Sequence, residues 1–148
     1  MKRILLVEDS TRDAELILSA FEANNLANEV IVARDGAAAL DYLYRRGPFA
    51  TREDDQPVLI LLDLKMPKVD GLEVLRQIKA DPVLKVIPVV MMTSSKAESD
   101  LVESYRLGVN AYVVKPMGFQ QLVEAVKQLG TFWALLNETP PPSWYRQQ

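Results

Sequence analysis

Five short apolar runs, each followed by a longer segment of mixed polarity, constrain the fold of this chain most strongly. The apolar runs span residues 4–7, 30–33, 58–62, 88–92 and 111–114. Each is as long as a typical strand and rich in Val, Ile and Leu, as expected of strands buried on both faces. The intervening segments carry apolar residues at helical spacing, over 10–24, 36–46, 71–80, 97–107 and from 118 onward. This repeat predicts an α/β fold, a doubly wound, five-stranded parallel sheet of the (βα)5 type.

The 148 residues are enough for one domain, over residues 1–137. Two segments lie outside the strand–helix repeat. Residues 47–57 are a polar insertion with two prolines and four consecutive charged residues, and we expect a mobile surface loop there. Residues 138–148 form a tail with three consecutive prolines and two aromatic residues, and the prolines favour polyproline II conformation.

Composition limits the possible chemistry and partners. The chain has no Cys and no His, which excludes disulfides, zinc thiolates, a cysteine nucleophile and the usual general base. Its formal charge of −3 gives no indication of a nucleic-acid partner. No apolar run has the length of a membrane span, and the N-terminal run is too short for a signal peptide. We therefore expect a cytoplasmic protein with neither a nucleic acid nor a membrane as partner.

Reactive side chains follow four of the five apolar runs. They are Glu8 and Asp9, Asp63, Thr93 and Lys115. The carboxyl ends of parallel strands share one edge of the sheet, where ligands of such folds bind. Clustered carboxylates suit Mg²⁺, and a carboxylate can also accept a phosphoryl group. Each residue alone has an ordinary explanation, such as a helix cap or a surface lysine, but their common placement favours metal-assisted phosphoryl transfer.

Over roughly residues 1–130 the chain resembles the receiver domains of two-component response regulators. The resemblance implies a flavodoxin-like sheet with strand order 2-1-3-4-5, which spacing alone does not give. The motifs that carry it are Leu5-Leu6-Val7-Glu8-Asp9, Leu61-Leu62-Asp63-Leu64-Lys65-Met66-Pro67 with Asp70-Gly71, Val89 to Thr93, and Tyr112-Val113-Val114-Lys115-Pro116.

The resemblance also implies a metal site and a phosphoacceptor. Asp63 corresponds to the residue that accepts the phosphoryl group. Glu8, Asp9, Asp63 and the backbone carbonyl of Lys65 correspond to the ligands of Mg²⁺, with Mn²⁺ as a possible substitute. Glu8 departs from the Asp that is also common at its position, and its longer side chain makes the metal geometry there less certain.

Further residues correspond to those that bind and sense the phosphoryl group. Thr93 and Lys115 match the phosphoryl-binding pair, and Thr93 and Tyr112 match the switch residues. Lys65 and Ser95 lie two positions after Asp63 and Thr93, where side chains border the path of hydrolytic water. The peptide bond between Lys115 and Pro116 is usually cis in the family.

Partners follow from the same resemblance. A sensor histidine kinase would donate the phosphoryl group, and the chain would catalyse only its own phosphorylation and dephosphorylation. Because the 148 residues leave no room for a DNA-binding domain, we expect output through protein contacts of the fourth helix, fifth strand and fifth helix. An apolar stripe on the last helix favours a homodimer. The residues predicted for that face are Leu122, Val126, Leu129, Phe132 and Trp133.

The stand-alone form, the Glu-Asp pair, the insertion and the Phe132-Trp133 end resemble the regulators paired with phytochrome-type histidine kinases. A chemotaxis-like regulator, a phosphorelay intermediate and a non-phosphorylated scaffold receiver remain alternatives. A haloacid-dehalogenase-type phosphatase is disfavoured, because Lys65 stands where such enzymes have a second Asp. An FMN module is disfavoured because Glu8 and Asp9 would repel its phosphate.

Overall fold

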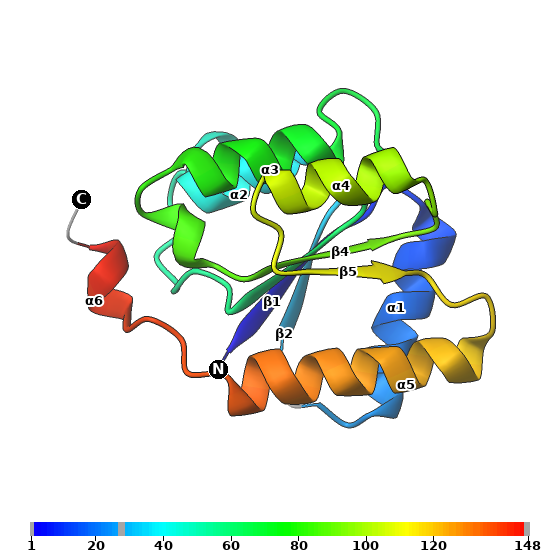
Figure 1. Cartoon of the computed structure of the whole chain (residues 1–148). Helices are drawn as coiled ribbons and strands as arrows, with labels where there is room; N and C mark the ends of the chain where they lie inside the picture. The colour runs from blue at the N-terminus through cyan, green and yellow to red at the C-terminus, as the bar shows by residue number, and fades with distance from the viewer. Residues whose placement is uncertain (1, 27–28, 147–148) are drawn as a thin grey trace.

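A five-stranded parallel sheet forms the centre of the molecule (Figure 1). The computed structural model describes residues 2–26 and 29–146. The strands lie in the order β2-β1-β3-β4-β5, and every neighbouring pair is parallel. The predicted doubly wound fold and its strand order are thus confirmed. The strands are β1 (Arg3–Val7), β2 (Glu29–Ala33), β3 (Leu59–Leu62), β4 (Val89–Thr93) and β5 (Ala111–Val114).

Helices cover both faces of this sheet. On one face lie α1 (Thr11–Ala23) and α5 (Phe119–Gly130), and on the other lie α2 (Gly36–Tyr44), α3 (Gly71–Ala80) and α4 (Glu98–Arg106) (Figure 1). In the part of the chain that the structure describes, no helix is both long and apolar enough to span a membrane.

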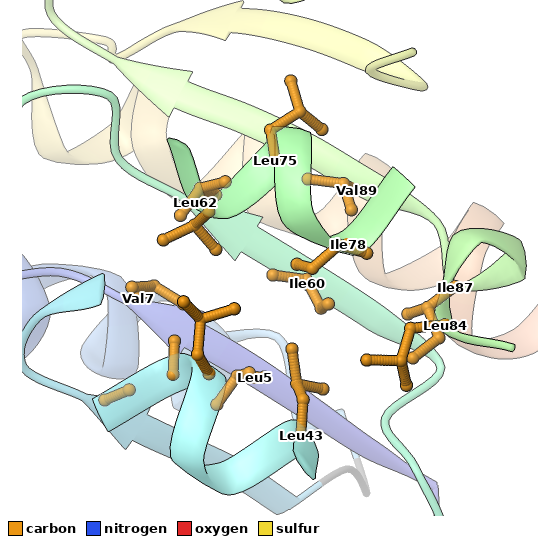
Figure 2. Packing of buried hydrophobic residues seen from close by; sticks show 14 of the residues in the cluster. Leu5, Val7, Leu43, Ile60, Leu62, Leu75, Ile78, Leu84, Ile87 and Val89 are labelled. Carbon is orange, nitrogen blue, oxygen red and sulfur yellow. The ribbon is translucent and has the colours of Figure 1, made fainter. Parts of the chain in front are cut away.

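The core consists of two apolar layers, because successive strand side chains point to opposite faces. Leu5, Ile60 and Leu62 pack towards α2 and α3 (Figure 2). Their neighbours Ile4 and Leu61 pack towards α1 and α5. All four residues of β3 are completely buried. Burial of each such side chain contributes about 1.5–3 kcal/mol to stability, so the central strand is firmly held and its last residue is followed at once by Asp63.

Local signals fix where the helices begin near that end of the sheet. The side chains of Ser10, Asp35 and Asp70 accept hydrogen bonds from backbone N–H groups in the first turns of α1, α2 and α3. Such caps contribute about 1 kcal/mol each. Gly71 begins α3, where a Cβ atom would lie 2.2 Å from the backbone oxygen of Asp63. Glycine therefore allows α3 to start directly against the end of β3.

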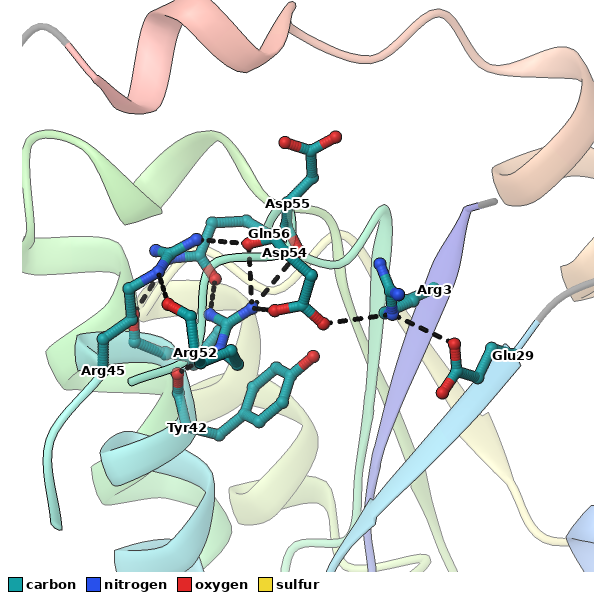
Figure 3. Close-up of polar contacts among 9 residues, drawn as sticks. Arg3, Glu29, Tyr42, Arg45, Arg52, Asp54, Asp55 and Gln56 are labelled. Carbon is teal, nitrogen blue, oxygen red and sulfur yellow. Dashed lines mark hydrogen bonds and ion pairs between the residues drawn. The ribbon is translucent and has the colours of Figure 1, made fainter. Parts of the chain in front are cut away.

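The insertion over residues 47–57 makes hydrogen bonds both to α2 and within itself (Figure 3). The expected mobility of this loop stays a prediction. The Arg52 guanidinium donates to the Tyr42 carbonyl at 3.1 Å, to the Asp54 carboxylate at 2.7 Å and to the Gln56 side chain at 2.7 Å. It also lies 3.9 Å from the Tyr42 ring centroid, a cation–π contact. Buried Gln56 donates in turn to the Leu43 carbonyl. The charges of the segment thus fasten it to α2 instead of leaving it in solvent.

The tail is partly helical, not an extended polyproline segment throughout. Pro141 has polyproline II dihedral angles, but Pro142–Tyr145 forms one helical turn, α6. The indole Nε1 of Trp144 donates to the Val83 carbonyl at 3.0 Å, and Tyr145 packs against the core. Proline at the first position of a helix is favourable, because its missing N–H would have no partner there. The last two residues, 147 and 148, lie outside the described residues.

The last helix corrects the predicted dimer face. Leu122 and Val126 are buried in the chain's own core, and Leu129 and Trp133 pack against it, so only Phe132 of the five is largely exposed. Beyond α5 the chain continues as a π-helix, Thr131–Leu136. Its wider turn shifts the apolar phase, and the exposed apolar surface at this end is formed by Phe132, Leu135 and Leu136.

Candidate functional site

The carboxyl edge of the sheet brings together the acidic residues that follow β1 and β3. In the described residues, one oxygen each from Glu8, Asp9 and Asp63 lies within 4.8 Å of the others. The parallel register sets Val7 beside Leu62, so the residues after these two strands meet. Glu8 and Asp63 are buried, whereas Asp9 is exposed. The structure therefore assembles the predicted acidic cluster.

Lys115 joins this cluster from the end of β5. Its Nζ lies 2.6 Å from Glu8 Oε1, 2.9 Å from Asp13 Oδ2 and 3.5 Å from Asp63 Oδ2. Burial by itself lowers the pKa of Lys115, but the hydrogen bonds to Glu8 and Asp13 outweigh it and raise the pKa. One ammonium group is thus shared among several carboxylates.

The pKa of Glu8 reflects its burial among these charged groups. Burial raises its pKa to about 7; the hydrogen bond from Lys115 opposes the shift, and the negative charge of Asp63 adds to it. A carboxyl group held in this way accepts either a proton or a cation. The site has more negative charge than Lys115 alone can neutralise.

The donor set fits a hard divalent cation. Mg²⁺ and Mn²⁺ prefer oxygen ligands, and the three clustered carboxylates offer only oxygen. A cleft of about 480 Å³ opens beside them, lined by Asp9, the 64–67 loop, Asp70 and Asp100. Its volume is large enough for water molecules and a phosphoryl group.

Thr93 lies on β4 and Tyr112 on β5, and Ser95 lies in the loop after β4. Thr93, the last residue of β4, is buried, and its Oγ1 accepts from the Ser95 backbone N–H at 3.3 Å. The Tyr112 hydroxyl donates to the Ser95 carbonyl at 3.1 Å. The loop after β4 is therefore tied both to the threonine and to the tyrosine of β5.

The peptide bond between Lys115 and Pro116 is not cis, contrary to the expectation from the resemblance. The described residues contain no cis peptide bond. The trans isomer is the lower in energy by about 0.5–1 kcal/mol for a bond of this type. The Lys115 backbone N–H donates to the Thr93 carbonyl at 2.8 Å, which extends the β4–β5 pairing to the site.

Two residues of the site escaped the sequence analysis. Asp13 contacts Lys115 from the first turn of α1, and Asp100 of α4 accepts a hydrogen bond from the Ser95 hydroxyl at 2.6 Å. Asp100 also lies 4.0 Å from the Lys65 ammonium, so one carboxylate approaches both side chains expected to border the water path. An acidic residue in the first helical turn was the only available signal, and it is common in helices without any such role.

A doubly wound sheet that gathers acidic residues, a threonine and a lysine at its carboxyl edge is the arrangement of phosphoacceptor signalling domains. The chain belongs to one family of that class, the response regulator receiver domains, whose family model matches residues 4–127. It is thus a receiver domain in sequence as well as in fold.

Several known response regulators are similar to this chain over most of its length. The response regulator Rcp1 of Synechocystis sp. is 43% identical over 132 residues, which cover 89% of this chain and 88% of Rcp1. The crystal structure of its Mn²⁺-bound form superposes with a TM-score of 0.86, at 41% identity over 95% of this chain and 100% of that one.

Two further solved structures are similar. The phosphorylated cyanobacterial phytochrome response regulator RcpA is 44% identical, with a TM-score of 0.87 over 95% of this chain and 99% of its own. The bacteriophytochrome response regulator RtBRR is 60% identical, with a TM-score of 0.77 over 99% of this chain and 90% of its own. The chain is therefore homologous to phytochrome-associated response regulators.

Proposed function

We propose that the chain is a phosphorylation-controlled regulator that takes a phosphoryl group from a sensor histidine kinase onto Asp63. One observation supports this more than any other. One oxygen each from Glu8, Asp9 and Asp63 lies within 4.8 Å of the others, Lys115 Nζ lies 3.5 Å from Asp63, and the buried Thr93 ends the neighbouring strand β4. Such a set contains a nucleophile, a cation site and groups that neutralise a phosphoryl oxygen.

In the proposed reaction, an oxygen of Asp63 attacks the phosphorus of a phosphohistidine in line with the P–N bond. That bond breaks as the O–P bond forms, and the leaving imidazole keeps the electron pair and takes a proton from solvent. Lys115 and the Thr93 hydroxyl bind the oxygens of the transferred group. Mg²⁺, held by Glu8, Asp9, Asp63 and the Lys65 carbonyl, would supply further charge neutralisation when bound.

The proposed response runs through the β4–β5 side of the sheet. Thr93 moves towards the phosphoryl group, and Tyr112, already bonded to the loop after Thr93, follows it. The face of α4, β5 and α5 then changes; among its exposed apolar residues are Tyr105 and Phe119. A coupling of about 1–3 kcal/mol would change the affinity for a partner roughly 5–150-fold.

A phytochrome-type histidine kinase is the proposed donor. The chain is 60% identical to the bacteriophytochrome response regulator RtBRR, and this likeness supports the assignment. Lys65 and Ser95 are proposed to set the lifetime of the aspartyl phosphate. Because Asp100 lies close to both side chains, Asp100→Ala should alter the rate of dephosphorylation by removing the acceptor of the Ser95 hydroxyl.

Intact-mass spectrometry after incubation with acetyl phosphate tests the proposal. A single phosphoryl addition should appear in the presence of Mg²⁺, and it should disappear without the cation or in Asp63→Asn. Asp54→Asn is the matched control, because it removes the same charge from the opposite edge of the sheet. Labelling that persists in Asp63→Asn, or that needs no cation, would exclude this mechanism.

We further propose a homodimer through the exposed end of the last helix. Phe132, Leu135 and Leu136 are 49%, 63% and 67% exposed, and adjacent large apolar side chains favour a protein interface. Sedimentation should give a dimer for the wild type and a monomer for the double variant Phe132→Ser, Leu135→Ser. The control is Val102→Ser on α4, which removes an exposed apolar residue elsewhere. A monomeric wild type, with and without phosphorylation, would refute the dimer.

A further inference from the structure

The Lys115 ammonium has a carboxylate partner outside the proposed phosphoryl-transfer set. Asp13 Oδ2 lies 2.9 Å from Nζ, nearer than Asp63 Oδ2 at 3.5 Å. The Lys115 side chain is 12% exposed and that of Asp13 is 32% exposed, so the pair is only partly screened by solvent. Asp13 belongs neither to the proposed phosphoryl-binding residues nor to the expected metal ligands. Its contact with Lys115 therefore needs a separate explanation.

The contact between Asp13 and Lys115 matters because the site already carries excess negative charge. Glu8, Asp9 and Asp63 already exceed the single positive charge of Lys115, and a phosphoryl group adds roughly −1.5 to −2. Asp13 brings another negative charge to the same ammonium. It competes with the incoming phosphoryl oxygens for Lys115.

The geometry shows which acceptors Lys115 favours before phosphorylation. An ammonium group has three N–H donors. Two of them have short contacts, to Glu8 and Asp13, whereas the distance to Asp63 is at the limit of a hydrogen bond. The ammonium thus lies nearer to Glu8 and Asp13 than to Asp63, the residue that would carry the phosphoryl group.

We propose that Asp13 is a positioning residue, which holds the Lys115 ammonium away from Asp63 and thereby slows phosphorylation of the resting chain. The inference rests on the proposed function and deepens it. Asp13 acts on the phosphoryl group through Lys115, without touching that group itself. Asp13 then lowers the rate at which small-molecule donors phosphorylate the protein.

Stabilisation of the α1 N-terminus is the competing explanation for Asp13. The carboxylate lies in the first turn, where the helix dipole favours negative charge. That effect changes the stability of α1 but does not depend on Lys115. The two explanations therefore differ in whether an effect of Asp13 on labelling survives the loss of the lysine.

The test measures initial rates of labelling by acetyl phosphate with Mg²⁺ in four proteins: wild type, Asp13→Asn, Asp13→Glu and Glu15→Gln. Removing the Asp13 charge should raise the rate about two- to fivefold, the scale of a partly exposed ion pair. Asp13→Glu keeps the carboxylate and should stay near wild type. Glu15→Gln removes the same charge from an exposed position of α1 and should change little. Asp13→Ser provides a second charge-removing variant if Asp13→Asn folds poorly.

Comparing labelling rates with and without Asp13→Asn in a Lys115→Gln background shows whether the effect of Asp13 depends on the lysine. The Lys115→Gln protein should be labelled slowly, and adding Asp13→Asn to it should not raise the labelling rate. An unchanged or lower rate in Asp13→Asn with the lysine present overturns the inference, as does an increase that persists in Lys115→Gln. If folded wild type is not labelled at all, the proposed function fails and this inference fails with it. Labelled wild type without an effect of Asp13 refutes the inference alone.

Discussion

The carboxyl edge and the amino edge of the sheet differ in how completely their charged side chains are paired. At the carboxyl edge, Glu8, Asp9 and Asp63 crowd around one ammonium, and burial raises the pKa of Glu8 to about 7. At the amino edge, the Arg52 guanidinium is also buried, but it is bonded on every side and faces the carboxylate of Asp54 (Figure 3). Both sites are polar, but the positive and negative charges balance only at the amino edge.

This difference in charge pairing indicates a structural role for the amino edge and a functional role for the carboxyl edge. A balanced, fully bonded network such as that of Arg52 holds an insertion against α2 and offers little to a ligand. An unbalanced cluster costs stability, and a cation or a phosphoryl-transfer reaction can use that imbalance. The edges should therefore respond oppositely when a charge is removed.

The largest effect is expected from Arg52→Met. Its side chain is 7% exposed, and the substitution would remove the donor to the Gln56 side-chain oxygen and one donor each to the Asp54 carboxylate and the Tyr42 carbonyl. The free energy of unfolding should fall by about 3 kcal/mol. Urea denaturation measures it, with exposed Arg106→Met as the control. A loss as small as that of the control would show that the amino edge is not a stabilising network.

The next effect is a dependence of stability on pH in the absence of metal. The Glu8 pKa rises from 4.5 to about 7 on folding, so between these values the folded chain binds more protons than the unfolded one. Stability should be greatest below the lower value and fall as pH rises through 7, by at most about 3 kcal/mol. Glu8→Gln should flatten this slope in urea titrations. An equal slope in that variant would assign it to other groups.

A matched pair of substitutions compares the two edges directly. Without metal, Asp63→Asn should raise the free energy of unfolding by about 1 kcal/mol, because it relieves repulsion among buried carboxylates. Asp54→Asn should lower it by about 1 kcal/mol, because it weakens the pairs with Arg3 and Arg52. Calorimetry on both variants gives the signs. Changes of the same sign would remove the proposed distinction between the edges.

The smallest effect concerns the tail. Trp144→Phe keeps the aromatic ring but removes the hydrogen bond from Nε1 to the Val83 carbonyl. A loss of about 1 kcal/mol is expected, without any change in labelling at the carboxyl edge. Thermal unfolding together with the acetyl phosphate assay tests both statements. Altered labelling would mean that the tail communicates with the site.

Much of the carboxyl edge was predictable from the sequence. Solid apolar runs such as residues 59–62 indicate buried parallel strands, and the polar residue that follows each run must lie at one edge. Glu8, Asp63, Thr93 and Lys115 were located by this rule. The order of the strands needed the family resemblance, because periodicity within a strand says nothing about its neighbours.

The features that escaped prediction depend on long-range contacts. Arg52 reads as part of a solvated charge run, and only the folded chain brings it over the Tyr42 ring. Asp13 reads as an ordinary first-turn acid until β5 places Lys115 beside it. The prediction of which side chains are exposed over residues 131–136 was wrong, because this segment is a π-helix and does not follow the α-helical period.

The link between Lys115 and Glu8 also bears on how the protein is made. The two residues are 107 positions apart, one after the first strand and the other after the last. A ribosome adds about 5–20 residues per second, so for some seconds a growing chain holds its acidic residues without the lysine that partners them. Under the proposed function, a nascent chain without Lys115 would be phosphorylated slowly, as expected for Lys115→Gln, and the full rate would come only with the finished fold.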